Sequence, residues 1–355
     1  MTGYGKTPPT KLEVDLFPSR HPIWSTLVEK PPQGVRFIER TGYAGKVYLL
    51  ASGLLRVKRL VHFCNGVKLA YGRRWVADME SVKVFFKDYG ELLNSDCVAR
   101  AERRLGTGDC RMLMPLTGAA ERTLRRYLRL KNYSVEVVYP SFYIEKAPDL
   151  RNGRNLVVFV GGSWRDRSFD SKGGREVAEA WLKVAGRYPV KMMMFSSPPP
   201  ELAKKLAEKG VFVGYMERAK LLNEVYPHTK LIVLPSMMDT VGYSVIEAMN
   251  FGAVPLVSDH FAMPEIVGDA GVVVKVPNKL WNDDGSHNFE FRKNLDSGPY
   301  EELVERLVDR MHVLLEDDDY WNTISERAFQ RMRFGPFSID ERNRRLIRVY
   351  ERALE

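Results

Sequence analysis

The stretch that decides the fold is "KLIVLPSMMDTVGYSVIEAMNFGAVPLVSD", residues 230–259. Its first and last segments, "KLIVLPS" and "VPLVSD", are short continuous apolar runs of the kind that form buried strands. Between them, "GYSVIEAMNFG" has helical spacing and closes on Gly252, with a helix start expected near Val241 or Gly242. A helix that connects two buried strands is typical of a parallel sheet, so we expect strand, helix and strand here.

The same alternation continues on both sides of this stretch. The sequence predicts strands at 155–162, 190–197, 211–216 and 270–276, helices at 173–188, 199–210 and 219–228, and long closing helices at 299–317, 320–333 and 340–355. Short apolar strands between helices predict a doubly wound α/β domain.

The first half of the chain is less regular, but it also suggests an α/β domain. We expect a helix over 118–133, capped by Thr117, and strands at 45–52, 60–67, 74–79, 110–117 and 135–142. The polar segment 145–155, with Pro148 and Gly153, is the expected linker between the two halves.

Charge is distributed unevenly along the 355 residues. Residues 1–150 contain 25 Lys and Arg against 15 Asp and Glu, a net +10, whereas residues 151–355 contain 29 against 30, a net −1. A basic domain suits phosphate-rich partners, although a solvated surface rich in cations explains it equally. No apolar run is long enough to span a membrane, and the first residues lack a signal-peptide core. Three cysteines without metal-ligand spacing indicate free thiols, so we expect a cytoplasmic protein.

Asp239 and Glu247 stand out within the opening stretch, with seven residues between them and Gly242 in the gap. Asp239 follows a strand at the carboxyl edge of the sheet, where ligands of open α/β sheets bind. The helix N-terminus can hold a phosphate, and Glu247 can accept hydrogen bonds from a ribose diol. A capping acid and a surface glutamate remain the plain alternative.

A second loop has similar chemistry. Gly161 and Gly162 end a predicted strand, and a loop with Arg165, Arg167 and Lys172 follows. Cations in such a loop can neutralise a diphosphate. The spacing is neither a dinucleotide fingerprint nor a P-loop, so a solvated basic loop is the alternative.

Together these segments resemble the retaining GT-B nucleotide-sugar glycosyltransferases, a large family with a Glu-x7-Glu motif. Residues 105–350 carry the resemblance through "VGGSWRDRSFDSKGG", "LLNEVYPHTKLIVLPS", the Asp239-to-Glu247 motif and "MPEIVGDAGVVVKV", in that order. The resemblance implies two Rossmann-like domains facing a central cleft. We expect an acceptor-side domain at 1–150, a donor domain at 151–335, and a C-terminal helix at 336–355 that packs back on the first domain.

The resemblance also implies roles for matching positions. Glu247 would hold the ribose, Asp239 would lie under the donor hexose as a catalytic residue, and Lys172 would neutralise the leaving diphosphate. The remaining donor-binding residues would be Arg165 or Arg167 at the diphosphate, Val241, Gly242 and Tyr243 through their amides, Tyr215 and Met216 beside the base, and Gly161 and Gly162 close to the donor. Asp239 departs from the family pattern because its side chain is one methylene shorter than glutamate.

The expected reaction is retaining transfer of a hexose to a glycan, lipid-linked or small phosphorylated acceptor. The leaving group is stabilised by cations, so no metal or other cofactor is expected. His62 and Asp78, at predicted strand ends of the first domain, are further catalytic candidates. The basic domain suits a peripheral position at an anionic membrane, and no nucleic acid partner is expected. The alternatives are an anion- or nucleic-acid-binding protein on an inactive scaffold, and a nucleotide-sugar epimerase.

Overall fold

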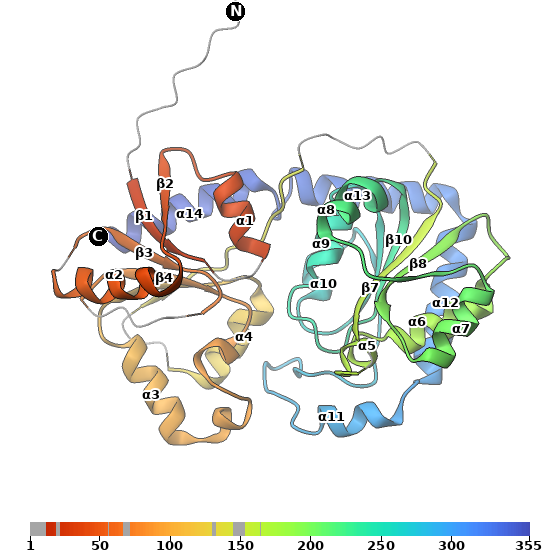
Figure 1. Ribbon diagram of the computed structural model, residues 1–355, viewed down its shortest axis with the longest axis horizontal. Coiled ribbons are helices and arrows are strands. Elements are labelled where there is room, and N and C mark those ends of the chain that lie inside the picture. The colour runs from red at the N-terminus through yellow and green to blue at the C-terminus, as the bar shows by residue number, and fades with distance from the viewer. Residues whose placement is uncertain are drawn as a thin grey trace, which may run out of the picture. The chain divides into compact units, whose positions relative to one another are not determined.

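The computed structural model describes residues 12–18, 22–55, 57–66, 72–129, 133–144, 153–163 and 165–355. The chain divides into two compact units, unit 1 with residues 1–143 and 336–355, and unit 2 with residues 144–335. Each described unit contains a six-stranded sheet in which every strand pair is parallel (Figure 1). Most of the linker expected at 145–155 lies outside the described residues.

Unit 1 is built on the strand order β2-β1-β3-β4-β5-β6. Its strands are β1 (Leu12–Phe17), β2 (Val35–Glu39), β3 (Leu60–Phe63), β4 (Trp75–Met79), β5 (Cys110–Pro115) and β6 (Ser134–Val135). Its helices are α1 (Pro22–Glu29), α2 (Gly42–Leu54), the 3₁₀ turns η1 (Val82–Phe85) and η2 (Gly90–Leu93), α3 (Ser95–Leu105), α4 (Gly118–Tyr127) and α14 (Ile339–Leu354).

The last helix of the chain belongs to the core of unit 1. α14 packs against β3, β4 and β5. Leu346, Val349, Tyr350 and Ala353 bury their side chains in one cluster with apolar residues of the sheet. Arg342, on the same helix, is also buried and donates hydrogen bonds to the Thr26 hydroxyl and the Lys30 carbonyl. Burial lowers the pKa of this guanidinium to about 10, so it remains charged near neutral pH.

The prediction of a strand at 45–52 is wrong, because these residues lie in α2. A short apolar run is compatible with either a strand or a helix, and here the turn at Thr41 and Gly42 starts a helix of 13 residues. The sequence analysis also missed β1 and β2, and the strand expected at 135–142 is reduced to the two residues of β6.

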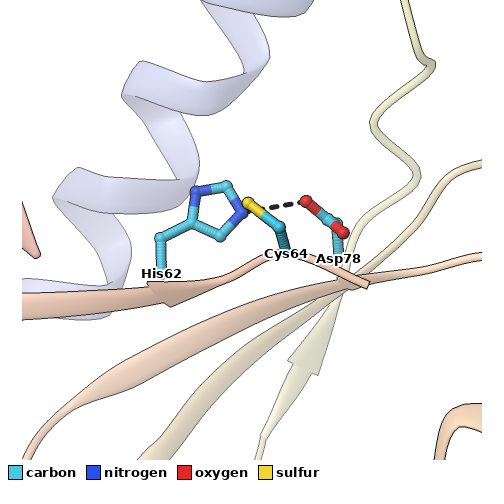
Figure 2. Close-up of side chains that lie close together, drawn as sticks. All are labelled: His62, Cys64 and Asp78. Atoms are coloured by element: carbon cyan, nitrogen blue, oxygen red, sulfur yellow. Dashed lines mark hydrogen bonds and ion pairs between the residues drawn. The ribbon is translucent and has the colours of Figure 1, made fainter. Parts of the chain in front are cut away.

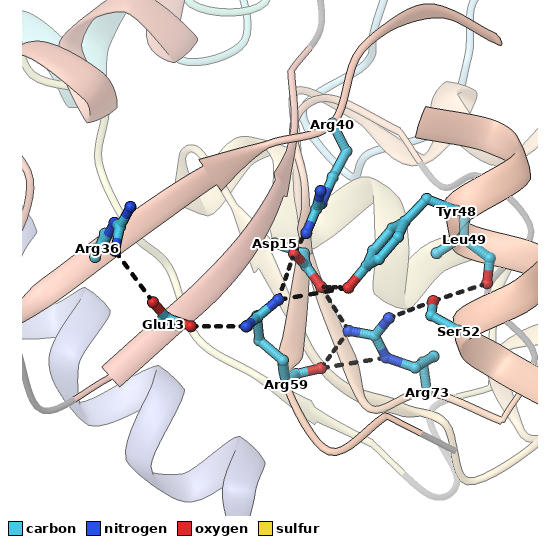
Figure 3. A network of polar contacts seen from close by, with 9 residues as sticks. All are labelled: Glu13, Asp15, Arg36, Arg40, Tyr48, Leu49, Ser52, Arg59 and Arg73. Carbon is cyan, nitrogen blue, oxygen red and sulfur yellow. Dashed lines mark hydrogen bonds and ion pairs between the residues drawn. The ribbon is translucent and has the colours of Figure 1, made fainter. Parts of the chain in front are cut away.

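A buried ion cluster joins α2 to the sheet (Figure 3). The Asp15 carboxylate of β1 is completely buried and accepts hydrogen bonds from Arg73 at 2.7 Å, Tyr48 at 3.0 Å and Arg40 at 3.0 Å. Arg73 is equally buried and also donates to the Ser52 hydroxyl at 2.5 Å. Because Tyr48 and Ser52 both come from α2, this cluster fixes the position of the helix on the sheet.

Unit 2 has the strand order β12-β11-β10-β7-β8-β9. Its strands are β7 (Leu156–Ser163), β8 (Lys191–Ser197), β9 (Phe212–Gly214), β10 (Thr229–Leu234), β11 (Val254–Ser258) and β12 (Val272–Val274). Its helices are α5 (Ser168–Ser171), α6 (Gly174–Val184), α7 (Pro200–Glu208), α8 (Arg218–Lys220), the π-helix η3 (Leu221–Val225), η4 (Tyr226–His228), α9 (Tyr243–Met249), α10 (Met263–Val267), α11 (Phe291–Asn294), η5 (Leu295–Ser297), α12 (Glu301–Glu316) and α13 (Asp318–Arg333).

The strand order of unit 2 reverses its direction at one point of the sheet. From β7 the chain proceeds through β8 and β9 in one direction, and from β10 through β11 and β12 in the other. The order therefore reverses between β7 and β10, which is the switch point of a doubly wound sheet, and ligands bind outside the carboxyl ends of the strands there. The predicted alternation of strands and helices in 151–335 is confirmed.

We expect Asp15→Ala to destabilise unit 1 by about 3–5 kcal/mol, because it leaves the buried Arg73 charge without its carboxylate. Glu13→Ala is the matched control on the same strand. Glu13 pairs with Arg59 and with the largely exposed Arg36, so its loss should cost no more than about 1 kcal/mol. Urea unfolding of both variants measures the difference, and equal costs would contradict the role of Asp15.

Candidate active site

The carboxyl ends of β7 and β10 bring together the two loops that the sequence analysis singled out. After β7, the chain runs through Arg165 and Arg167 to α5 and Lys172. After β10, it runs through Pro235 and Asp239 to Gly242, and α9 begins at Tyr243. Both loops lie at the switch point, so residues far apart in the sequence can act on one ligand.

Direct contacts hold these two loops against each other. The Met237 amide donates to the Ser171 carbonyl at 2.9 Å, and the Ser171 hydroxyl lies 2.6 Å from the Met238 sulfur. Gly173 has a φ of +74°, and a Cβ atom there would lie 2.8 Å from the Pro235 carbonyl oxygen. Only glycine fits this backbone geometry and this close approach.

Lys172 and Asp239 form the ion pair at the centre of the site. The Lys172 Nζ lies 3.3 Å from the Asp239 Oδ1, and both side chains are partly buried. The Asp239 amide donates to the Ser236 hydroxyl at 3.0 Å, which fixes the turn that carries the carboxylate. Among the described residues, the buried Oδ2 of Asp239 has no hydrogen-bond partner. A buried carboxylate oxygen left without a donor is costly unless a ligand supplies one.

Glu247 lies on α9 and is 4% exposed, which excludes the alternative of a surface glutamate. Arg218 Nε lies 2.6 Å from Glu247 Oε1. Burial raises the pKa of this carboxyl, and the Arg218 charge opposes the shift. Sequence reasoning missed Arg218, although a cation just after the predicted strand 211–216, at the carboxyl edge of the sheet, could have indicated it.

The other predicted donor-binding residues vary in what surrounds them. Arg167 pairs with Asp296 at 2.6 Å, and the Arg165 amide donates to the Ser163 hydroxyl at 3.2 Å. Gly161 and Gly162 lie in β7, where a Cβ atom would meet Phe159 and Ser168 respectively, so packing within the protein accounts for both glycines.

The predicted residues around the nucleotide differ in exposure. Tyr215 is 87% exposed and Met216 is partly buried, just after β9. Val241 is buried, Gly242 has a φ of +66° at the start of α9, and Tyr243 is partly buried.

The catalytic candidates of the first domain lie in unit 1 (Figure 2). His62 Nε2 is 3.1 Å from Asp78 Oδ2, and His62 Nδ1 is 2.8 Å from the Tyr350 hydroxyl of α14. The Asn65 amide donates to the other oxygen of Asp78. Both side chains are buried beside a cavity with room for about one water molecule. This network is sufficient for a structural role, and a catalytic role for His62 and Asp78 stays a prediction.

Cys64 adds a thiol to this pair. The ligand atoms of His62, Cys64 and Asp78 lie within 4.8 Å of one another, a set that the spacing of the cysteines did not reveal.

Two acidic segments elsewhere in the chain, around Asp317 and Asp283, form contacts within the protein. The Asp317 carboxylate caps α13 by accepting from the Tyr320 amide, and Lys279 pairs with both Asp259 and Asp283.

We expect Gly173→Ala to weaken ligand binding at the switch point and to lower the stability of unit 2. The added methyl group cannot avoid the Pro235 backbone, so it must separate the loops that carry Lys172 and Asp239. Gly186→Ala is the matched control, because Gly186 has a similar φ of +81° but an added Cβ meets nothing within 4 Å. The control should cost about 1–2 kcal/mol from backbone strain alone. Thermal unfolding of both variants tests this, and identical effects would show that the close approach is unimportant.

Comparisons with known proteins show what this chain is similar to. The family described as "Glycosyl transferases group 1" matches residues 154–282, which contain both loops and the Asp239-to-Glu247 motif. O-antigen chain mannosyltransferase B of Escherichia coli is 29% identical over 105 residues, which are 28% of this chain and 27% of that protein. The chain thus matches about a quarter of the length of this curated relative.

Solved structures extend the similarity to the whole fold. A glycosyltransferase from Rickettsia africae ESF-5 has a TM-score of 0.63 and 11% identity, with 97% of this chain and 99% of that chain covered. WaaG, a glycosyltransferase involved in lipopolysaccharide biosynthesis, has a TM-score of 0.59 and 13% identity, with 95% and 99% covered. Residues 154–282 thus match the model of the group 1 glycosyltransferases, and the chain has the GT-B fold.

Proposed function

We propose that the protein is a retaining glycosyltransferase that moves a hexose from a nucleoside-diphosphate sugar to an acceptor hydroxyl. The observation that carries the proposal is the Lys172–Asp239 pair at the switch point, with a buried aspartate oxygen that lacks a donor. A cation and an unsatisfied acceptor side by side suit a ligand that combines an anionic leaving group with hydroxyl groups.

The main requirement of this reaction is to stabilise the negative charge that develops on the leaving diphosphate. Lys172 supplies a positive charge that is already fixed by Asp239 and by the packed loop, so little reorganisation is needed as negative charge develops. Asp239 keeps one oxygen on Lys172 and offers the other to a sugar hydroxyl. Its shorter side chain holds that oxygen closer to its own backbone than a glutamate would.

The nucleoside would lie further along the same edge. Glu247 is anchored by Arg218 through Oε1, and its carboxylate can accept from a ribose diol. The exposed ring of Tyr215 offers an apolar face on which a base can stack.

The acceptor is proposed to be a glycan, a lipid-linked sugar or a small phosphorylated molecule. Two similar proteins are named for O-antigen chain mannosyl transfer and for lipopolysaccharide biosynthesis, which favours a glycan on a lipid carrier. The described helices include none long and apolar enough to cross a bilayer. A position at the membrane surface would therefore depend on peripheral contacts.

Nucleoside diphosphates and their sugars should raise the melting temperature of the protein in a thermal-shift panel. At about 100 times Kd, a ligand that binds only the native state stabilises it by about 2.7 kcal/mol. Lys172→Met should weaken diphosphate binding at least about tenfold, because a charged hydrogen bond is lost, and leave nucleoside binding unchanged. Lys191→Met, at an exposed lysine of β8, is the control. A panel in which no nucleotide shifts the wild-type protein would sink the donor assignment and favour an anion-binding protein.

Sugar transfer should continue in the presence of EDTA. We propose that Lys172 takes the role that a divalent cation plays in metal-dependent transferases, so removing free metal ions should leave the rate within about twofold. Turnover measured with and without EDTA checks this. Activity that disappears with EDTA and returns with Mg²⁺ or Mn²⁺ would overturn metal independence without affecting the donor assignment.

A further inference from the structure

α2 has an apolar face that is exposed to solvent. Tyr43, Val47, Leu50 and Leu54 follow one another at spacings of four, three and four residues, which places them on one side of the helix. Their exposed fractions are 82%, 46%, 57% and 87%, and the next residue, Leu55, is 77% exposed. Single exposed apolar residues are ordinary, but a continuous stripe of this kind marks an interaction site.

The inner face of the same helix makes polar contacts with the sheet and buries one leucine, Leu49. Tyr48 and Ser52 point to the sheet and form hydrogen bonds with Asp15 and Arg73 (Figure 3). Most surface helices bury their apolar face and expose their polar face. In α2 an ion cluster holds much of the inner face, where Leu49 is also buried, whereas Tyr43, Val47, Leu50 and Leu54 point outward. The helix thus lacks an apolar contact that its sequence is suited to make.

The length and charge of α2 narrow the choice of partner. Thirteen residues make a helix of about 20 Å, too short to span a bilayer but sufficient to lie along its surface. The single charged residue of α2 is Lys46, which is exposed. Residues 35–59 contain six Lys or Arg and one acid. Arg36, Arg40 and Arg59 pair with the acids of β1, and Lys58 is exposed like Lys46. The sequence of unit 1 carries 29 Lys and Arg against 17 Asp and Glu, a net +12.

We propose that α2 is a membrane-docking helix, whose stripe of Tyr43, Val47, Leu50 and Leu54 inserts into the interface of an anionic bilayer. Flanking cations attract anionic headgroups, and the apolar side chains enter the acyl boundary. A second copy of this chain is a poorer partner, because pairing two such faces would bring like charges together.

The arginine-rich helix α4 of the same unit shows the opposite arrangement. Leu124 and Leu128, in and just after α4, are buried. α4 therefore exposes its cations and buries Leu124, whereas α2 exposes Leu50 and Leu54.

Co-sedimentation of the full chain with vesicles tests the proposal. We expect binding to vesicles of phosphatidylcholine with about 30% phosphatidylglycerol, weak binding to phosphatidylcholine alone, and release in about 0.5 M NaCl. The double variant Leu50→Gln/Leu54→Gln should bind at least about tenfold more weakly, because two apolar side chains no longer leave water. Leu93→Gln, at a 71% exposed leucine in η2 of the same unit, is the matched control and should bind as the wild type does.

Two further measurements distinguish a loss of membrane binding from a loss of nucleotide binding and from a change in oligomeric state. The nucleotide-induced thermal shift should be unchanged in the double variant, since α2 lies outside the donor domain, so a failure of vesicle binding is separable from a failure of the proposed function. Light scattering after size exclusion reports the oligomeric state. Equal vesicle binding by wild type and double variant would overturn the proposal. A wild-type dimer that the double variant abolishes, with no vesicle binding, would overturn it in favour of self-association.

Discussion

The close approach of the β7–α6 and β10–α9 loops is the constraint on which the candidate site depends. Gly173 touches the Pro235 carbonyl, and Ser171 accepts the Met237 amide, so two segments more than 60 residues apart behave as one rigid support. Lys172 and Asp239 occupy adjacent positions because of this support. The conformational entropy that Lys172 and Asp239 lose in forming the pair is therefore lost during folding and not on ligand binding.

Each unit contains an aspartate with at least one buried carboxylate oxygen, and the two aspartates differ in how many hydrogen-bond donors surround them. In unit 1, Asp15 is surrounded by three arginines and a tyrosine, so all its acceptor positions are filled. In unit 2, Asp239 keeps a buried oxygen without a donor. A fully paired carboxylate serves the architecture, whereas a half-paired one in a partly buried site is suited to receive a ligand.

The fold of unit 2 was predicted well from the sequence, and the physical reason is the regularity of its pattern. Continuous apolar strands and capped helices alternate there, so the pattern alone locates the carboxyl edge of the sheet and assigns Asp239, Glu247 and Lys172 to it. The sequence did not reveal contacts between residues that lie far apart along the chain. Arg218 pairs with Glu247 across 29 residues, which no local pattern reveals.

Neither the helical conformation of α2 nor its exposed face was predicted from the sequence. The segment 45–52 is short and largely apolar, and periodicity cannot separate a helix from a strand in such a run. The face of α2 that is exposed depends on Asp15 of β1 and on Arg73, which lies just before β4.

The return of α14 to unit 1 also determines the order in which the protein can be completed during synthesis. Leu346, Val349 and Tyr350 belong to the core of unit 1, whose sheet precedes unit 2 in the sequence, yet these residues follow unit 2. Residues 144–335 can close their own core beforehand. The sheet of unit 1 is thus translated before unit 2 but completed after it, and its core face stays uncovered until α14 has been made, a stage at which exposed apolar surface favours aggregation.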